Sequence, residues 1–82
     1  KALFISTEEL HWIDPVERME VGKRRRYMVR IRYRQPLQQA ELIMESEGLY
    51  ILFDEPQRGI TQGQFAAWYD GARLIGSGVI AK

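Results

Sequence analysis

One segment of the sequence, residues 23–34, alternates basic and apolar side chains and constrains the fold more than any other feature. Seven of the chain's 12 basic residues lie in these 12 positions, and no acidic residue occurs between Glu20 and Glu41. From Arg26 onward one alternating set of positions is largely basic and the other is apolar, namely Tyr27, Val29, Ile31 and Tyr33. A period of two places the two sets on opposite faces of a β-strand. The segment therefore predicts a strand over about Arg25–Arg34, with one face for a core and one for solvent.

The arginine face of this strand has two interpretations. Guanidinium groups bind phosphate oxygens bidentately and stack on bases, so a row of them fits an RNA-binding surface. Alternatively, the arginines pair with acidic side chains on neighbouring strands. The net charge of the whole chain is only +1, so the basic strand is a local patch and does not imply general affinity for nucleic acid. From this segment alone both interpretations remain open.

The rest of the chain reads as short strands separated by turn residues. Together with the basic strand, the apolar runs predict about six strands, over residues 3–5, 25–34, 40–45, 49–53, 65–69 and 73–80. Residues 7–13 are ambiguous between a helical turn and a strand, and Asp70-Gly71 predicts a two-residue hairpin. The pattern is typical of an all-β fold, either a closed or nearly closed barrel or a small sandwich, with at most one short helical turn.

The core and the last strand carry more specific predictions. Gly76 and Gly78 alternate in that strand, which leaves room for a bend or for close approach of another backbone. The side chains expected to be buried are Val29, Ile31, Leu42, Ile51, Phe53 and Trp68. Trp12, Trp68, Tyr33 and Tyr69 are interpreted as residues of the core or its rim.

Length and composition predict one small domain spanning residues 1–82. A chain of 82 residues buries roughly 60–65% of its unfolded surface, enough for a single core. The absence of cysteine excludes disulfides, a thiolate nucleophile and a cysteine zinc site, and fits a cytoplasmic location. No apolar run approaches the roughly 20 residues needed to cross a bilayer, so we expect no membrane partner. The sequence starts without Met, and we expect it to be a piece of a longer protein.

The sequence predicts no catalytic residue and no metal site. His11 is the only histidine, and no cysteine is present to pair with it. Asp54 and Glu55 are adjacent, so a strand would point them to opposite faces, and we expect them to pair with arginines or to end the strand. The glycine-containing segments Gly59–Gly63 and Gly76–Gly78 lack the Gly-Lys-Ser/Thr ending and the following helix of a phosphate loop.

Several motifs in order along the chain resemble one family. They are Arg32-Tyr33-Arg34-Gln35-Pro36, Phe53-Asp54-Glu55-Pro56-Gln57-Arg58, Thr61-Gln62-Gly63-Gln64, Trp68-Tyr69-Asp70-Gly71 and Ile75-Gly76-Ser77-Gly78-Val79-Ile80. Together they resemble the C-terminal domain of tRNA-specific 2-thiouridylase, and residues 10–13 resemble the first segment of that domain. The resemblance covers nearly the whole chain.

The resemblance implies a six-stranded β-barrel similar to those of translation factors, forming a C-terminal fragment of a larger enzyme. Enzymes of this family use ATP, with magnesium, to activate the wobble uridine of certain tRNAs and replace its 2-oxygen with sulfur. It further implies a cytoplasmic enzyme with an N-terminal catalytic domain, a central domain and a sulfur-relay protein as donor. The catalytic elements lie outside these 82 residues, so the barrel itself would bind no cofactor and would help to hold the tRNA.

Carried over by position, the family's tRNA contacts fall on Arg32 and Tyr33 of the Arg-Tyr-Arg-Gln motif and on Gln64 of the Gly-Gln motif. Arg30 and Arg34, on the same face of the predicted strand as Arg32, would add phosphate contacts. Strict alternation points Tyr33 inward, so its hydroxyl or backbone would have to reach the RNA from near the strand's end.

The sequence departs from the family pattern in three places. Gln62 stands where proline is usual, Ser77 stands where glycine is expected, and residues 23–26 are more basic than expected. Two other classes of function remain open. The chain could be a stand-alone RNA-binding or ribosome-associated barrel, or a structural module that packs against other domains without touching RNA.

Overall fold

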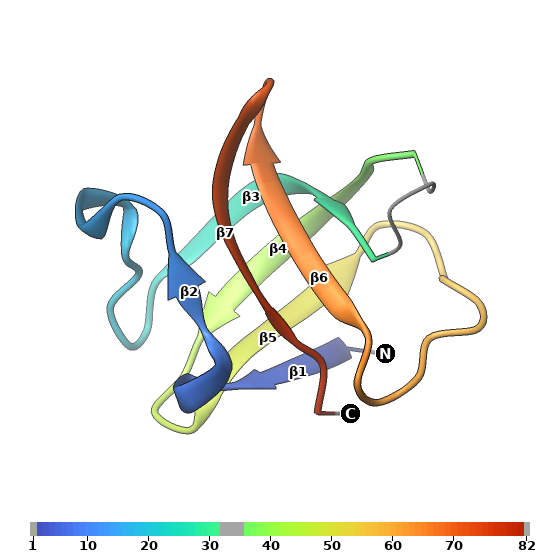
Figure 1. Cartoon of the computed structure of the whole chain (residues 1–82), viewed down its shortest axis with the longest axis horizontal. Helices are drawn as coiled ribbons and strands as arrows, with labels where there is room; N and C mark the ends of the chain where they lie inside the picture. The colour runs from blue at the N-terminus through green and yellow to red at the C-terminus, as the bar shows by residue number, and fades with distance from the viewer. Residues whose placement is uncertain (1, 32–35, 82) are drawn as a thin grey trace.

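The computed structural model describes residues 2–31 and 36–81, which form one antiparallel sheet (Figure 1). The described residues contain seven strands: β1 Ala2–Ser6, β2 His11–Trp12, β3 Arg24–Arg30, β4 Gln38–Met44, β5 Gly48–Phe53, β6 Phe65–Asp70 and β7 Arg73–Val79. Two single-turn 3-10 helices, η1 Thr7–Glu9 and η2 Pro15–Glu17, flank β2. The all-β prediction is confirmed.

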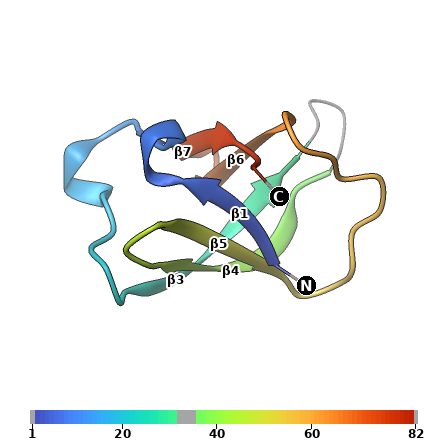
Figure 2. The same cartoon turned by 90° about the horizontal axis from the view of Figure 1, so that it is seen from below.

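The sheet curls on itself in the order β1-β5-β4-β3-β6-β7-β2. Figures 1 and 2 show β6 and β7 lying across the layer formed by β3, β4 and β5, with β1 at the side. Among the described residues the barrel is not fully closed, since β1 and β2 are the two edges of the sheet. A backbone hydrogen bond from the amide of Ala81 to the carbonyl of Phe4, at 2.8 Å, links the end of the chain to β1.

The count of seven strands, instead of about six, comes from the segment that the sequence left ambiguous. Residues 7–13 form both alternatives in succession, first η1 and then the two-residue β2, which pairs with β7. The second turn, η2, was not expected. Its start is stabilised by Asp14, whose carboxylate accepts a hydrogen bond from the Val16 amide at 3.0 Å. None of the helical segments in the described residues has the length and apolarity needed to span a bilayer.

β3 follows the predicted alternation over its described length. Val29 and Ile31 are buried and Tyr27 is half-buried, whereas Arg26 on the other face is exposed. The strand runs from Arg24 to Arg30 and does not include Ile31; the rest of its predicted length, residues 32–34, lies outside the described residues.

The core lies between the two layers and is made of alternate residues from β1 and β3–β7. Five of the six side chains expected in it are buried: Val29, Ile31, Leu42, Ile51 and Trp68. Phe53 is the exception, because it is half-buried and packs against the edge of the core. It is the last residue of β5 and lines an open pocket, so solvent reaches one side of the ring.

The two glycines of β7 permit the close approach that the sequence predicted. A Cβ atom at Gly76 would lie 2.8 Å from the His11 carbonyl oxygen and 2.8 Å from Trp68 Nε1. At Gly78 it would lie 2.6 Å from Cγ2 of Ile5. Any side chain at these positions would push away β2, β1 or the buried tryptophan. The predicted hairpin at Asp70-Gly71 is also present, with Gly71 at φ +62°, a conformation that glycine adopts without steric cost.

Candidate nucleic-acid interface

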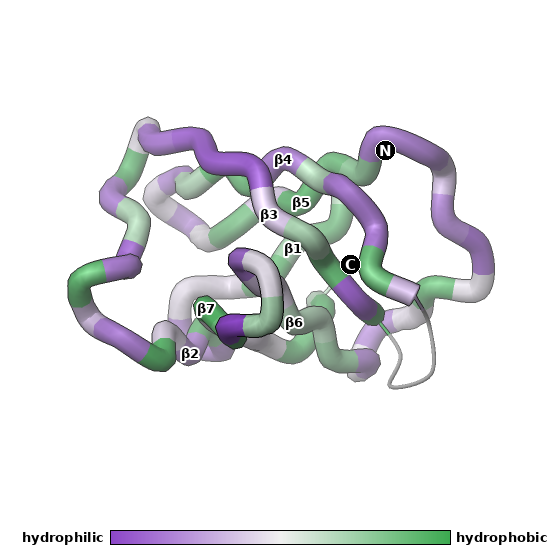
Figure 3. Tube along the Cα trace, turned by 90° about the horizontal axis from the view of Figure 1, so that it is seen from above, coloured by the Kyte–Doolittle hydropathy of each residue, from purple (hydrophilic) through white to green (hydrophobic). Residues whose placement is uncertain are grey.

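The outward arginines at the start of β3 pair with acids of the neighbouring strand β4 and of the segment that follows β5. Arg24 Nη1 lies 3.4 Å from both carboxylate oxygens of Glu41, on β4. Arg26 donates a short hydrogen bond to Asp54, which follows β5, and this bond raises the pKa of Arg26. Both pairs are largely exposed to solvent, so they stabilise the fold weakly. The structure favours the acid-pairing interpretation for this end of the strand. Figure 3 shows the corresponding run of hydrophilic residues where β3 begins.

Arg25 belongs to a second charge cluster at the same end of β3. Glu17, the last residue of η2, accepts from Arg25 at 3.4 Å and from Arg73 of β7 at 2.9 Å. Arg25 also donates to the Tyr27 hydroxyl at 3.4 Å, and this bond is the main cause of its raised pKa. The Glu17 carboxylate therefore links the segment between β2 and β3 to two strands, β3 and β7, that are far apart in sequence.

At the other end of β3, Arg30 lies over an aromatic ring. Its guanidinium carbon is 5.3 Å from the centroid of the Tyr69 ring, on the adjacent strand β6, which is within the range of a cation–π contact. Arg30 is half-buried and pairs in register with Ala67. Tyr69 is also half-buried, so it belongs to the rim, as predicted.

The position of Gln64 is determined by three hydrogen bonds at the entrance to β6. Its side-chain oxygen Oε1 accepts from the Thr61 amide at 2.8 Å, and its backbone amide donates to the Thr61 carbonyl at 3.3 Å. Its own carbonyl accepts from the Ile80 amide at 2.7 Å. Because Oε1 is bonded within the turn, the orientation of the side-chain amide is set, and its NH2 group is the end that is left to donate to a ligand.

Gln64 and Arg30 lie at the same end of the sheet. Gln64 directly precedes β6, and Arg30 pairs with Ala67, three residues further along. At the rise of an extended strand the two positions are about 10 Å apart along β6. The remaining predicted contacts, Arg32, Tyr33 and Arg34, lie outside the described residues, so their roles stay predictions.

Sequence reasoning missed one residue of this surface. Phe65, the first residue of β6, is 60% exposed and is the only exposed Phe, Tyr or Trp among the residues that the structure describes. The signal was available, because Ala66 and Trp68 are buried and a period of two then turns Phe65 outward.

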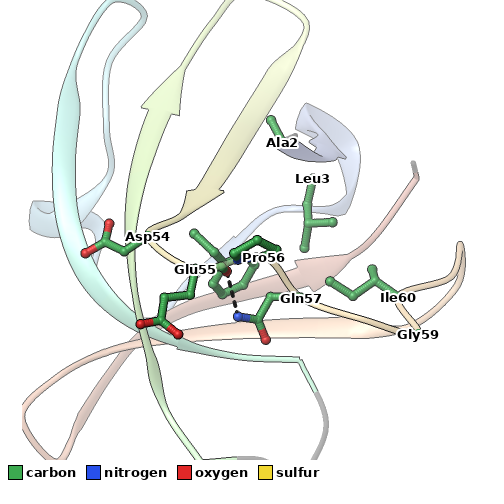
Figure 4. Close-up of a pocket in the computed structure, with 9 residues that line it drawn as sticks. Ala2, Leu3, Asp54, Glu55, Pro56, Gln57, Gly59 and Ile60 are labelled. Carbon is green, nitrogen blue, oxygen red and sulfur yellow. Dashed lines mark hydrogen bonds between the residues drawn. The ribbon is translucent and has the colours of Figure 1, made fainter.

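A pocket of about 650 Å³ opens beside the β5–β6 connection (Figure 4). It is lined by Ala2, Leu3, Phe53, Asp54, Glu55, Pro56, Gln57, Gly59 and Ile60. Gln57 Nε2 donates to the Glu55 carbonyl at 2.9 Å, which stabilises the turn at the rim. Within residues 2–31 and 36–81, no three acidic or histidine side chains come together in a way that could hold a metal ion. The lining offers a largely apolar surface and no paired nucleophile and base.

The fold and this surface define a class of β-barrel domain, and comparison with known proteins gives the family. Residues 4–80 match the family described as the aminomethyltransferase beta-barrel domain, and the chain belongs to that family. It is 51% identical over 81 residues to the tRNA-specific 2-thiouridylase MnmA of Flavobacterium johnsoniae, and 47% identical over 81 residues to that of Christiangramia forsetii. The MnmA protein of Pseudomonas aeruginosa is 42% identical over 71 residues.

These relatives confirm the resemblance to tRNA-specific 2-thiouridylase that the motifs indicated. The alignments cover 99% of this chain for the first two and 87% for the third. The chain spans only 18–20% of the length of these relatives.

Proposed function

We propose that residues 1–82 form a single, non-catalytic domain that contacts tRNA, the C-terminal β-barrel of an ATP-dependent tRNA-specific 2-thiouridylase. The observation that carries this proposal is the 51% identity over 81 residues to a protein named as that enzyme. The order and spacing of the sequence motifs support the same assignment.

In this proposal the chemistry belongs to the rest of the parent enzyme. ATP with magnesium, the sulfur-relay donor, and the catalytic and central domains would act outside the barrel, in the cytoplasm. The barrel would hold the tRNA while its wobble uridine is thiolated at position 2. Its contribution to the rate would be through positioning, because a correctly held substrate loses less entropy on reaching the reactive geometry.

The contacts would be made at the end of the sheet that carries Gln64 and Arg30. Arg32 and Tyr33 follow Arg30 in the chain, and we propose that they contact the tRNA together with Gln64. The NH2 group of Gln64 is a donor suited to phosphate, ribose or base oxygens, and the bond from the Thr61 amide presets its direction. Arg30 and Arg34 would add contacts to phosphate.

The paired arginines support a different role for residues 23–26. Arg24, Arg25 and Arg26 each already contact a carboxylate, and an RNA phosphate would have to displace it. We propose that this basic run serves the fold and contributes little to tRNA binding. If the whole surface behaved in this way, the chain would be a structural packing module without RNA contact, and the experiment below distinguishes the two.

The test is binding of fluorescently labelled tRNA to the wild-type chain, Arg32→Ala and Gln64→Ala, followed by anisotropy at several salt concentrations. We expect weak binding, because few contacts must offset the entropy lost on association. Three or four phosphate contacts imply a slope of roughly −2 to −4 in log affinity against log salt. Arg32→Ala should reduce affinity more than Gln64→Ala, since a charged hydrogen bond contributes about 1.5–3 kcal/mol and a neutral one about 1.

Arg73→Ala is the control, because it also removes one positive charge. Arg73 lies on β7, near the start of β3 and away from the end that carries Arg30. Its fold should be verified by circular dichroism, since Arg73 contacts Glu17. The tRNA-contact proposal is wrong if both Arg32→Ala and Gln64→Ala retain wild-type affinity at low salt. It is also wrong if Arg73→Ala weakens binding as much as Arg32→Ala does.

A further inference from the structure

Within the described residues, the ring of Phe65 is largely exposed and gains little from burial. A phenylalanine exposed over 60% of its surface forgoes most of the stabilisation that burial of an aromatic side chain provides. The next two residues of β6, Ala66 and Ala67, are buried and half-buried. Phe65 also directly follows Gln64, whose side chain is oriented by the bond from Thr61. The exposed ring therefore lies at the entrance to β6, next in the chain to a residue whose side-chain amide has a preset orientation.

The outer face around Phe65 is a shelf of small side chains. Phe65 pairs in register with Val79 of β7, and Ala67, the next outward position, pairs with Ser77 on one side and Arg30 on the other. The next aromatic ring on this face, Tyr69, is about 13 Å further along the strand at the usual rise. Between the two rings this face therefore carries the small side chains of Ala67 and Ser77.

The charge of this shelf favours an anionic ligand. Among the described residues, none of those paired across β3, β6 and β7 from Arg30 and Ala67 to Phe65 and Val79 is acidic. Arg30 supplies a positive charge at its border, with the guanidinium over Tyr69. A planar group to stack on the ring and an anionic group near the arginine are both present in a nucleotide whose base is unpaired.

We infer that Phe65 stacks on an unpaired base of the bound tRNA, with Arg30 facing an adjacent phosphate. This inference rests on the proposed function and adds a base-stacking residue to it. Base–aromatic stacking depends little on the identity of the base, so Phe65 contributes affinity and helps to place the strand without reading its sequence.

The experiment compares three substitutions at Phe65 in the 82-residue chain. Phe65→Ala removes the ring, Phe65→Leu keeps an apolar side chain without a π-face, and Phe65→Trp keeps and enlarges the π-face. Each is titrated by anisotropy against tRNA, a single-stranded RNA, and a blunt-ended RNA duplex without unpaired bases. Because the side chain is exposed, all three variants should fold as the wild type does, which circular dichroism verifies.

We expect Phe65→Ala to lower affinity for tRNA and single-stranded RNA by about 5- to 150-fold, the range given by alanine substitution at stacking residues. Phe65→Leu should bind nearly as weakly as Phe65→Ala, whereas Phe65→Trp should bind at least as tightly as the wild type. Affinity for the duplex should not change. The slope against salt should also not change, because no charge is removed.

Three outcomes would overturn this inference but leave the proposed function standing. They are wild-type affinity for Phe65→Ala, equal affinities for Phe65→Leu and Phe65→Trp, and an equal loss on duplex RNA, which has no unpaired base. A wild-type chain that is dimeric in sedimentation and becomes monomeric in Phe65→Ala would instead assign the ring to a contact between copies. A wild-type chain that binds no RNA at all overturns the proposed function and this inference with it.

Discussion

Gly76→Ala tests the close packing of β2 on β7. The added methyl carbon would lie 2.8 Å from the His11 carbonyl oxygen, 2.8 Å from Trp68 Nε1 and 2.9 Å from Trp68 Cε2. Favourable carbon contacts are about 3.5–4.0 Å, so both neighbours would have to move by roughly 1 Å. One neighbour is backbone and the other is a completely buried indole, so neither can give way by a simple rotation.

The expected loss of stability is about 1–3 kcal/mol. Overpacking of a well-packed site costs about 1–3 kcal/mol. Displacing the Trp68 ring would also weaken its edge contact with Trp12, at 5.5 Å between centroids, a type of contact worth about 0.5–1.5 kcal/mol. In the opposite direction, alanine lowers the conformational entropy of the unfolded chain, which stabilises the folded state by roughly 0.4–1 kcal/mol. For a domain of this size, the net loss corresponds to a fall of roughly 5–20 °C in the unfolding midpoint.

Urea denaturation followed by tryptophan fluorescence measures this loss of stability. The signal comes from the substituted site, since Trp12 and Trp68 are the chain's two tryptophans. Two controls separate steric from backbone effects. Ser77→Ala changes the next residue of β7 and should cost less than about 0.5 kcal/mol. In Gly71→Ala the added Cβ has no atom within 4 Å, but the backbone at this position has φ +62°, which disfavours alanine. The substitution should therefore cost about 1 kcal/mol and leave the native tryptophan spectrum unchanged. Wild-type stability and spectrum in Gly76→Ala would refute the argument.

Further predictions concern the core, acid stability and activity. Ile31→Ala should cost about 2–5 kcal/mol, and Phe53→Ala, at a partly buried ring, about 2 kcal/mol or less; equal losses in urea denaturation would contradict the difference in burial. The pKa of Glu47 is lowered by a bond to its own backbone and by the Tyr50 hydroxyl at 3.0 Å, so its stabilising effect is present above its ordinary pKa of 4.5 and is lost as pH falls through the lowered value. Glu47→Gln should therefore flatten the decline of thermal stability below pH 4.5, and an unchanged profile would exclude this origin. Under the proposed function, the chain alone should neither hydrolyse ATP nor thiolate tRNA; thiolated uridine above background, measured by mass spectrometry, would contradict this.

The sequence by itself determined six of the seven described strands and the class of fold, because these depend on local patterns. Alternation in residues 23–34 predicted β3 and the burial of Val29 and Ile31. The Asp70-Gly71 turn and the paired glycines of β7 were likewise readable, since a tight turn or a close approach requires a residue type at one position. The ordered motifs predicted the family that the comparisons confirmed.

Only the tertiary structure decided how distant residues meet. Arg26 pairs with Asp54, 28 positions away, and Arg73 pairs with Glu17, 56 positions away. A two-residue strand such as β2 carries too few positions for any periodicity, and its existence depends on the backbone of β7 being accessible at Gly76. The orientation of the Gln64 amide depends on a hydrogen bond within a folded turn. Local periodicity assigns a side chain to a face, but its neighbours on that face depend on strand order and register, which only the folded chain determines.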